Sequence, residues 1–121
     1  MNHILVADDV LHNRQLLKDI LVQKGYLVSE ATNGEQAVEL ARQIQPALIL
    51  MDIQMPILDG YRAIQILKAD RATEGIKIIA ITSFAMKGDL AHIMQSGCDA
   101  YIAKPINTRD LVAQIEQVLA I

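Results

Sequence analysis

Residues 47–52 are Ala-Leu-Ile-Leu-Met-Asp, five apolar side chains in succession followed by a carboxylate. A continuous apolar run of this length is typical of a strand that helices cover on both faces, and such strands belong to parallel sheets. Open parallel sheets bind their ligands beyond the carboxyl ends of the strands. Asp52, the acidic residue that closes this run, is therefore the first candidate for a functional residue.

Four further short runs share this character, and the segments between them have helical spacing. The five expected strands are residues 4–7, 26–29, 47–51, 77–82 and 100–103. The apolar residues that predict the five helices are Leu16, Leu17, Ile20 and Leu21, then Ala37, Val38, Ala41 and Ile44, then Tyr61, Ile64 and Leu67, then Leu90, Ile93 and Met94, and finally Leu111, Ile115, Val118 and Leu119. The run 26–29 is the most mixed, so we expect it at an edge of the sheet.

This alternation predicts an α/β domain with a doubly wound parallel sheet of five strands in the order 2-1-3-4-5 and five helices. Gly25 and Gly97 are expected to end helices, and Asn107 with Asp110 to begin the last one. A chain of 121 residues is long enough to bury a core, so we expect one domain over residues 1–121.

Composition and charge exclude several classes of function. The net charge is −3 with no basic run, so a nucleic acid is not expected as a direct partner. The apolar runs are far shorter than the roughly 20 residues that span a bilayer, and the N-terminus has no signal-peptide pattern. Cys98 has no second cysteine with which to form a disulfide or a zinc site, which predicts a cytoplasmic protein.

Carboxylates follow the first and third strands, which are neighbours in the predicted order. Asp8, Asp9 and Asp52 should converge there, and their mutual repulsion would have to be relieved by protons or a cation. Mg²⁺ fits such a site, with Asp9 and Asp52 as direct ligands, Asp8 acting mainly through water, and the backbone carbonyl of Gln54 as a further ligand. The alternative is that Asp8 and Asp9 cap the first helix and Asp52 only ends a strand.

Thr82 and Lys104 close the fourth and fifth strands, so both should point toward the same crevice. Either one alone is commonly an ordinary surface residue, but an ammonium and a hydroxyl can both contact an anionic group on Asp52. The whole set suits an acyl phosphate on Asp52, with the carboxylate as nucleophile and Lys104 and Mg²⁺ neutralising charge. The three histidines are interpreted as ordinary residues, and no phosphate-binding glycine loop is present.

These motifs resemble those of response regulator receiver domains, the CheY-like superfamily, over nearly the whole chain. The matching segments are residues 4–9, Asn13 and Arg14 with Leu17, residues 50–56 continuing to Asp59 and Gly60, Ile81 with Thr82, and residues 101–105. Residues 84–89 and 97–101 are most like the DivK type of single-domain response regulator. Residues 52–56 are also similar to receivers fused to hybrid kinases.

The resemblance implies a flavodoxin-like (βα)5 fold and a place in two-component or phosphorelay signalling. A histidine kinase or histidine phosphotransfer protein would donate a phosphoryl group to Asp52, with Mg²⁺ held at Asp8, Asp9 and Asp52. Thr82 would then move toward the phosphoryl group and Tyr101 would turn inward. The surface of the fourth helix, fifth strand and fifth helix would thereby change for a downstream protein.

Three further points come from the same resemblance. Val10 stands where asparagine is frequent, which leaves the core chemistry intact. Gln54 and Phe84 occupy positions that adjust the lifetime of the phosphoryl group. The Lys104–Pro105 peptide bond is cis in many relatives.

We expect a stand-alone phosphorylated regulator that is not an enzyme, and three alternatives remain. A Mg²⁺-dependent phosphatase would need insertions to enclose a substrate, and the chain has no room for them. A receiver-like protein that binds partners without phosphorylation is disfavoured by the intact acidic set with Thr82 and Lys104. The third alternative is a receiver excised from a hybrid histidine kinase or a larger regulator.

Overall fold

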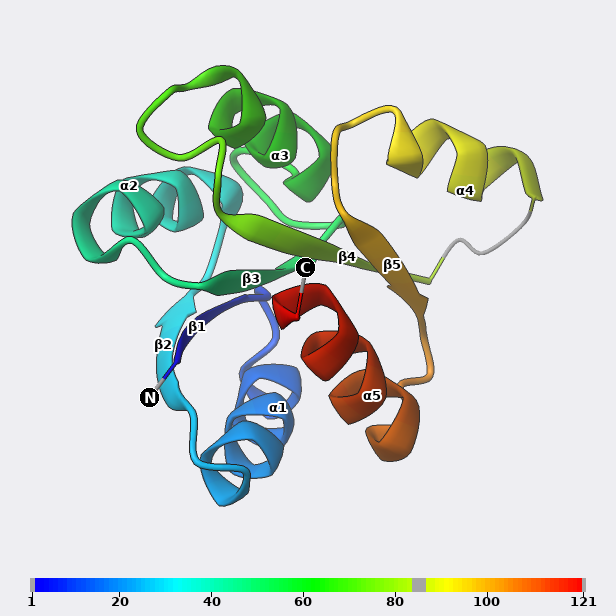
Figure 1. Cartoon of the computed structure of the whole chain (residues 1–121). Coiled ribbons are helices and arrows are strands. Elements are labelled where there is room, and N and C mark those ends of the chain that lie inside the picture. Colours follow the sequence, from blue (N-terminus) through cyan, green and yellow to red (C-terminus); the bar gives the residue numbers. More distant parts are fainter. Residues whose placement is uncertain (1, 84–86, 121) are drawn as a thin grey trace.

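The structure, a computed structural model, describes residues 2–83 and 87–120. Strands and helices alternate along the described chain (Figure 1). The strands are β1 (His3–Ala7), β2 (Leu27–Ala31), β3 (Leu48–Asp52), β4 (Lys77–Thr82) and β5 (Ala100–Ala103). The helices are α1 (Leu11–Gln23), α2 (Gly34–Ile44), α3 (Gly60–Ala69), α4 (Lys87–Met94) and α5 (Thr108–Leu119). In the described ranges, no helix combines the length and apolar character that crossing a membrane requires.

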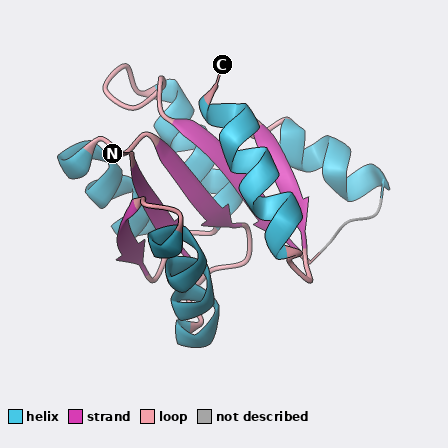
Figure 2. Ribbon diagram, turned by 60° about the horizontal axis from the view of Figure 1, so that its bottom comes forward, coloured by secondary structure: helices cyan, strands magenta, loops and turns pink. Residues whose placement is uncertain are grey.

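The strands form one parallel sheet in the order β2-β1-β3-β4-β5, which confirms the predicted topology. Helices α1 and α5 cover one face, and α2, α3 and α4 cover the other (Figures 1 and 2). Side chains alternate between two cores: Ile49 and Met51 of β3 pack toward α2, α3 and α4, whereas Leu48 and Leu50 pack toward α1 and α5. All five residues of β3 are buried, as its continuous apolar sequence predicts.

Short polar side chains begin three of the helices. The side-chain oxygens of Asn33 and Asp59 accept hydrogen bonds from the backbone amides of the third residue after each, both at 2.8 Å. Asn107 accepts from two amides in the first turn of α5, which confirms the predicted start of that helix. Gly25 follows α1 with φ +89° and Gly97 follows α4 with φ +100°, so both occupy the left-handed region where predicted.

Several local expectations differ from the structure. The second strand is Leu27–Ala31 rather than 26–29, because all five of its residues pair in register with His3–Ala7 of β1. Its position at the edge of the sheet is confirmed. Leu16, expected on the buried face of α1, is 51% exposed, and Met94, expected on the buried face of α4, is 43% exposed. In α1, Leu17 and Leu21 are buried and Ile20 packs against the same core, whereas the remaining apolar positions face solvent.

Gly60 brings the start of α3 into close contact with the end of β3. Its backbone amide donates to the carbonyl oxygen of Ile53 at 2.9 Å. A Cβ atom at position 60 would overlap the carbonyl oxygen and carbon of Asp52. The backbone of α3 can approach Asp52 this closely only because residue 60 has no side chain.

Gly60→Ala should therefore lower the free energy of unfolding by about 3 kcal/mol, because the clash is with backbone that cannot rotate away. Urea denaturation followed by circular dichroism measures the change. Gly75→Ala is the matched control, since a Cβ atom at Gly75 meets no atom within 4 Å. Equal stability of the two variants would contradict the close approach.

Candidate functional site

The winding of the sheet reverses at β1, which lies between β2 and β3. Helix α1 follows β1 on one face of the sheet and α3 follows β3 on the other, so the loops after β1 and β3 diverge (Figure 1). Asp8 follows β1 directly and Asp52 is the last residue of β3. Both carboxylates therefore lie at the position where doubly wound sheets bind ligands.

Three carboxylates meet at this position. Asp8, Asp9 and Asp52 each offer one oxygen, and these atoms lie within 4.8 Å of one another. Asp8 and Asp52 are each 2% exposed, whereas Asp9 is exposed. The convergence expected from their positions at the strand ends is therefore present, with two carboxylates buried and one open to solvent.

Backbone amides and one lysine hold the two buried carboxylates. Oδ1 of Asp52 accepts from the amide of Gln54 at 2.9 Å, and Oδ2 accepts from Nζ of Lys104 at 2.6 Å. The same ammonium group is 3.9 Å from Oδ2 of Asp8. Oδ1 of Asp8 accepts from the amide of Val10 at 2.8 Å. Val10 itself is the N-cap residue of α1 and has no side-chain cap, so the alternative in which Asp8 and Asp9 cap this helix is wrong.

The charges in this cluster do not balance. Burial is the main cause that raises the pKa of Asp8 above its ordinary value, and the carboxylate of Asp52 raises it further. The amide of Val10 and the ammonium group of Lys104 act in the opposite direction. Three carboxylates share one ammonium group, so the cluster favours an additional positive charge.

The donor set fits a hard divalent cation. Carboxylate oxygens are the ligands that Mg²⁺ and Ca²⁺ prefer, and Mg²⁺ commonly uses few protein ligands and keeps several waters. The exposed carboxylate of Asp9 leaves the cluster accessible from solvent. Asp8, Asp9 and Asp52 are thus the residues that could hold a metal ion.

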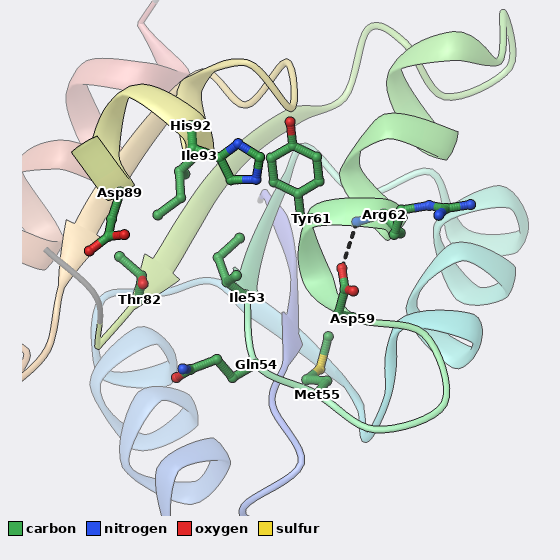
Figure 3. A pocket seen from close by; sticks show the side chains of 10 residues that line it. All are labelled: Ile53, Gln54, Met55, Asp59, Tyr61, Arg62, Thr82, Asp89, His92 and Ile93. Atoms are coloured by element: carbon green, nitrogen blue, oxygen red, sulfur yellow. Dashed lines mark hydrogen bonds between the residues drawn. The ribbon is translucent and has the colours of Figure 1, made fainter. Parts of the chain in front are cut away.

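The other predicted site residues lie around this cluster. Lys104 follows β5 directly and contacts Asp52, and its peptide bond to Pro105 is cis. Thr82 ends β4 and is fully buried. It lines a pocket of about 470 Å³ together with Gln54, which lies in the loop after β3 (Figure 3). Tyr101 on β5 is 36% exposed and so faces outward.

Phe84, assigned an effect on phosphoryl lifetime, lies outside the described residues. Gln54 is exposed, and its amide is the donor to Asp52 described above. The roles assigned to these two positions stay predictions.

Arg14, for which the sequence predicted no individual role, holds the backbone at the end of β1. Its guanidinium group donates to the backbone carbonyl of Asp8 at 2.9 Å and to the carboxylate of Glu30 at 3.3 Å. These contacts tie the end of β1 to the edge strand β2. A basic residue five positions after an acidic pair was the available signal, but its partner Glu30 is identified only once the register of β2 is known.

The fold and the site together define a flavodoxin-like domain with an acidic cluster at the switch point of its sheet. Residues 4–116 match the model of the response regulator receiver domain, and the chain belongs to that family. It is therefore a receiver domain of two-component signalling.

Known proteins of similar sequence and structure agree with this membership. The polar-differentiation response regulator DivK of Brucella anthropi is 40% identical over 116 residues, which cover 96% of this chain and 94% of the relative. The receiver domain of a histidine kinase from Syntrophus aciditrophicus has a TM-score of 0.93 and 29% identity, and the match covers 99% and 91% of the two chains. The receiver domain of a sensor histidine kinase from Pseudomonas aeruginosa PAO1, crystallised with a magnesium ion coordinated in its active-site cleft, has a TM-score of 0.92, 32% identity and coverage of 99% and 98%.

Repulsion among the three carboxylates should lower the free energy of unfolding when no cation is bound. In a buffer with EDTA, Asp8→Asn should raise the free energy of unfolding by about 1 kcal/mol, because it removes one like charge while keeping an oxygen for the Val10 amide. Magnesium chloride at ten times its dissociation constant should stabilise the wild type by about 1.4 kcal/mol, and Asp8→Asn by much less. Urea denaturation measures both effects.

Asp19→Asn serves as the control, since Asp19 is an exposed residue of α1. It should respond to magnesium as the wild type does. An Asp8→Asn variant that gains as much stability from magnesium as the wild type would contradict the assignment of Asp8 to a metal site.

Proposed function

We propose that this receiver domain accepts a phosphoryl group on Asp52 from a phosphorylated histidine of a kinase or phosphotransfer protein, in a Mg²⁺-dependent reaction. The observation that carries the proposal is the environment of Asp52. Its buried carboxylate contacts Lys104 at 2.6 Å and lies within 4.8 Å of the carboxylate oxygens of Asp8 and Asp9.

The proposed metal ligands are Asp8, Asp9 and Asp52, with the backbone carbonyl of Gln54 as a further oxygen. When bound there, Mg²⁺ supplies positive charge that neutralises the transferring phosphoryl group and relieves the repulsion among the carboxylates. The three carboxylates are assigned as ligands because the mutual distances of their oxygens suit one small ion.

In the proposed reaction, a carboxylate oxygen of Asp52 attacks phosphorus. An oxygen–phosphorus bond forms, the phosphorus–nitrogen bond to the donor histidine breaks, and the imidazole leaves with the bonding electron pair. Lys104 contacts the carboxylate before transfer and pairs with a phosphoryl oxygen afterwards. The hydroxyl of Thr82, at the end of the neighbouring strand, donates to another phosphoryl oxygen.

The proposed output is a change of surface rather than catalytic turnover of a free substrate. Thr82 moves toward the phosphoryl group, and Tyr101 turns from its outward position into the space beside it. The surface of α4, β5 and α5 is thereby altered for a downstream protein. We further propose that residues 1–121 act as one receiver domain in the cytoplasm, where the single free thiol of Cys98 stays reduced.

Phosphorylation is tested with acetyl phosphate and magnesium chloride, followed by intact-protein mass spectrometry. The wild type should gain one phosphoryl group, whereas Asp52→Asn or excess EDTA should abolish the gain. Lys104→Ala should slow the reaction at least about tenfold, because one positive charge at the transferring group is lost. A phosphoryl group that persists in Asp52→Asn would refute the assignment of Asp52.

A protein donor must dock around Asp52, and apolar side chains are exposed on the segments that leave β1 and β3. Leu11 at the start of α1 is 57% exposed, and Ile57 in the loop before α3 is 78% exposed. Exposed apolar residues beside a functional site commonly mark a protein interface. We propose that these two residues contact the histidine donor.

Leu11→Glu should slow phosphotransfer from a phosphorylated histidine kinase or phosphotransfer protein of the host by about tenfold, because a charge would be buried in the interface. The rate with acetyl phosphate should stay within about twofold of the wild type. Val22→Glu is the control, since Val22 is 52% exposed but lies eleven positions further along α1, about 16 Å from Leu11. Equal effects of the two variants on transfer from the protein donor would contradict this docking surface.

A further inference from the structure

Helices α3 and α4 are joined by a contact between two aromatic rings. The rings of Tyr61 and His92 are stacked with centroids 4.4 Å apart and an interplanar angle of 7° (Figure 3). Tyr61 is the second residue of α3 and His92 lies in the last turn of α4. Tyr61 is half-buried and His92 is exposed, so the stack adds little to the core and instead fixes one helix against the other.

Tyr61 is held rigidly relative to the phosphorylation site. The preceding residue, Gly60, bonds to Ile53 and packs without a side chain against the backbone of Asp52. Asp59 caps the helix through the amide of Arg62 at 2.8 Å. A displacement of the backbone at Asp52 is therefore transmitted to the first turn of α3.

Helix α4, in contrast, is lightly anchored. Of its side chains at residues 88–94, Ile93 alone is buried. The stack with Tyr61 is thus a substantial part of what sets the position of α4.

The space beneath α4 allows the helix to move. The pocket of about 470 Å³ runs between the loop after β3 and α4, and it is lined by Ile53, Thr82, Asp89 and His92 among others (Figure 3). A shift of α4 toward Thr82 would reduce this space. It would also separate the rings of His92 and Tyr61, because Tyr61 is fixed to β3.

We propose that the Tyr61–His92 stack is a positioning pair that holds α4 in its resting arrangement and opposes the phosphorylated arrangement of Asp52 and Thr82. This inference rests on the proposed function. A contact made in one arrangement and lost in the other shifts the equilibrium between them by the free energy of that contact. Loss of the stack should therefore favour the phosphorylated arrangement. A variant without the stack should bind a mimic of the phosphoryl group more tightly than the wild type does.

The test measures the affinity of the full chain for beryllofluoride, a mimic of the phosphoryl group, in magnesium chloride. Tyr61→Leu and His92→Leu should each tighten binding by about two- to tenfold, the size expected for one aromatic pair. The double variant should bind no tighter than the single ones, because all three lack the same contact. Tyr61→Phe and His92→Phe keep two rings and should stay within about twofold of the wild type.

The direction of the change separates positioning from a merely structural role. A stack that only stabilised the fold would lower the melting temperature on removal without tightening the binding of beryllofluoride. If Tyr61→Leu does not fold, the affinities of His92→Leu and His92→Phe for beryllofluoride are compared instead, because His92 is exposed and its substitution should leave the fold intact.

Unchanged or weaker binding in the leucine variants, or effects that add in the double variant, would overturn the inference while leaving the phosphorylation of Asp52 intact. A wild type that binds no beryllofluoride and gains no phosphoryl group would overturn the proposed function and this inference with it.

Discussion

Three carboxylates and one ammonium group meet at the ends of β1 and β3, and the properties of the site follow from this imbalance. Asp8 and Asp52 are almost fully buried, and each is held by a backbone amide two residues further along the chain. Lys104 contacts Asp52 directly and Asp8 more distantly. The two excess negative charges equal the charge of one divalent cation, and the exposed Asp9 leaves access for that ion.

The positions of these groups depend on backbone contacts outside the cluster. Arg14 bonds to the carbonyl of Asp8 and to Glu30 of the edge strand, so it fixes the end of β1 from one side. Gly60 permits α3 to approach the end of β3 from the other side. Through these contacts the end of β1 is connected to α1, which carries Arg14, and the end of β3 to α3, which begins at Gly60.

The proteins that this chain resembles have different roles by name. This chain resembles the response regulator DivK and also the receiver domains of histidine kinases from two other bacteria. Its sheet and charged pocket are therefore compatible with more than one signalling context. Outside this site, the exposed Leu11 and Ile57 and the ring contact between α3 and α4 are features of the surface of this chain.

The sequence by itself determined the strand order and the meeting of Asp8, Asp9 and Asp52, because apolar runs and strand-end residues are local patterns with a small set of possible windings. It did not determine the register of β2, the exposure of Leu16, the role of Arg14 or the stack of Tyr61 on His92. Each of these depends on which residues distant in the chain become neighbours, and on how far a helix extends past the rim of the sheet. Only the packed tertiary structure sets those distances, since hydrophobic periodicity identifies the face that a helix buries but not the partner that it meets.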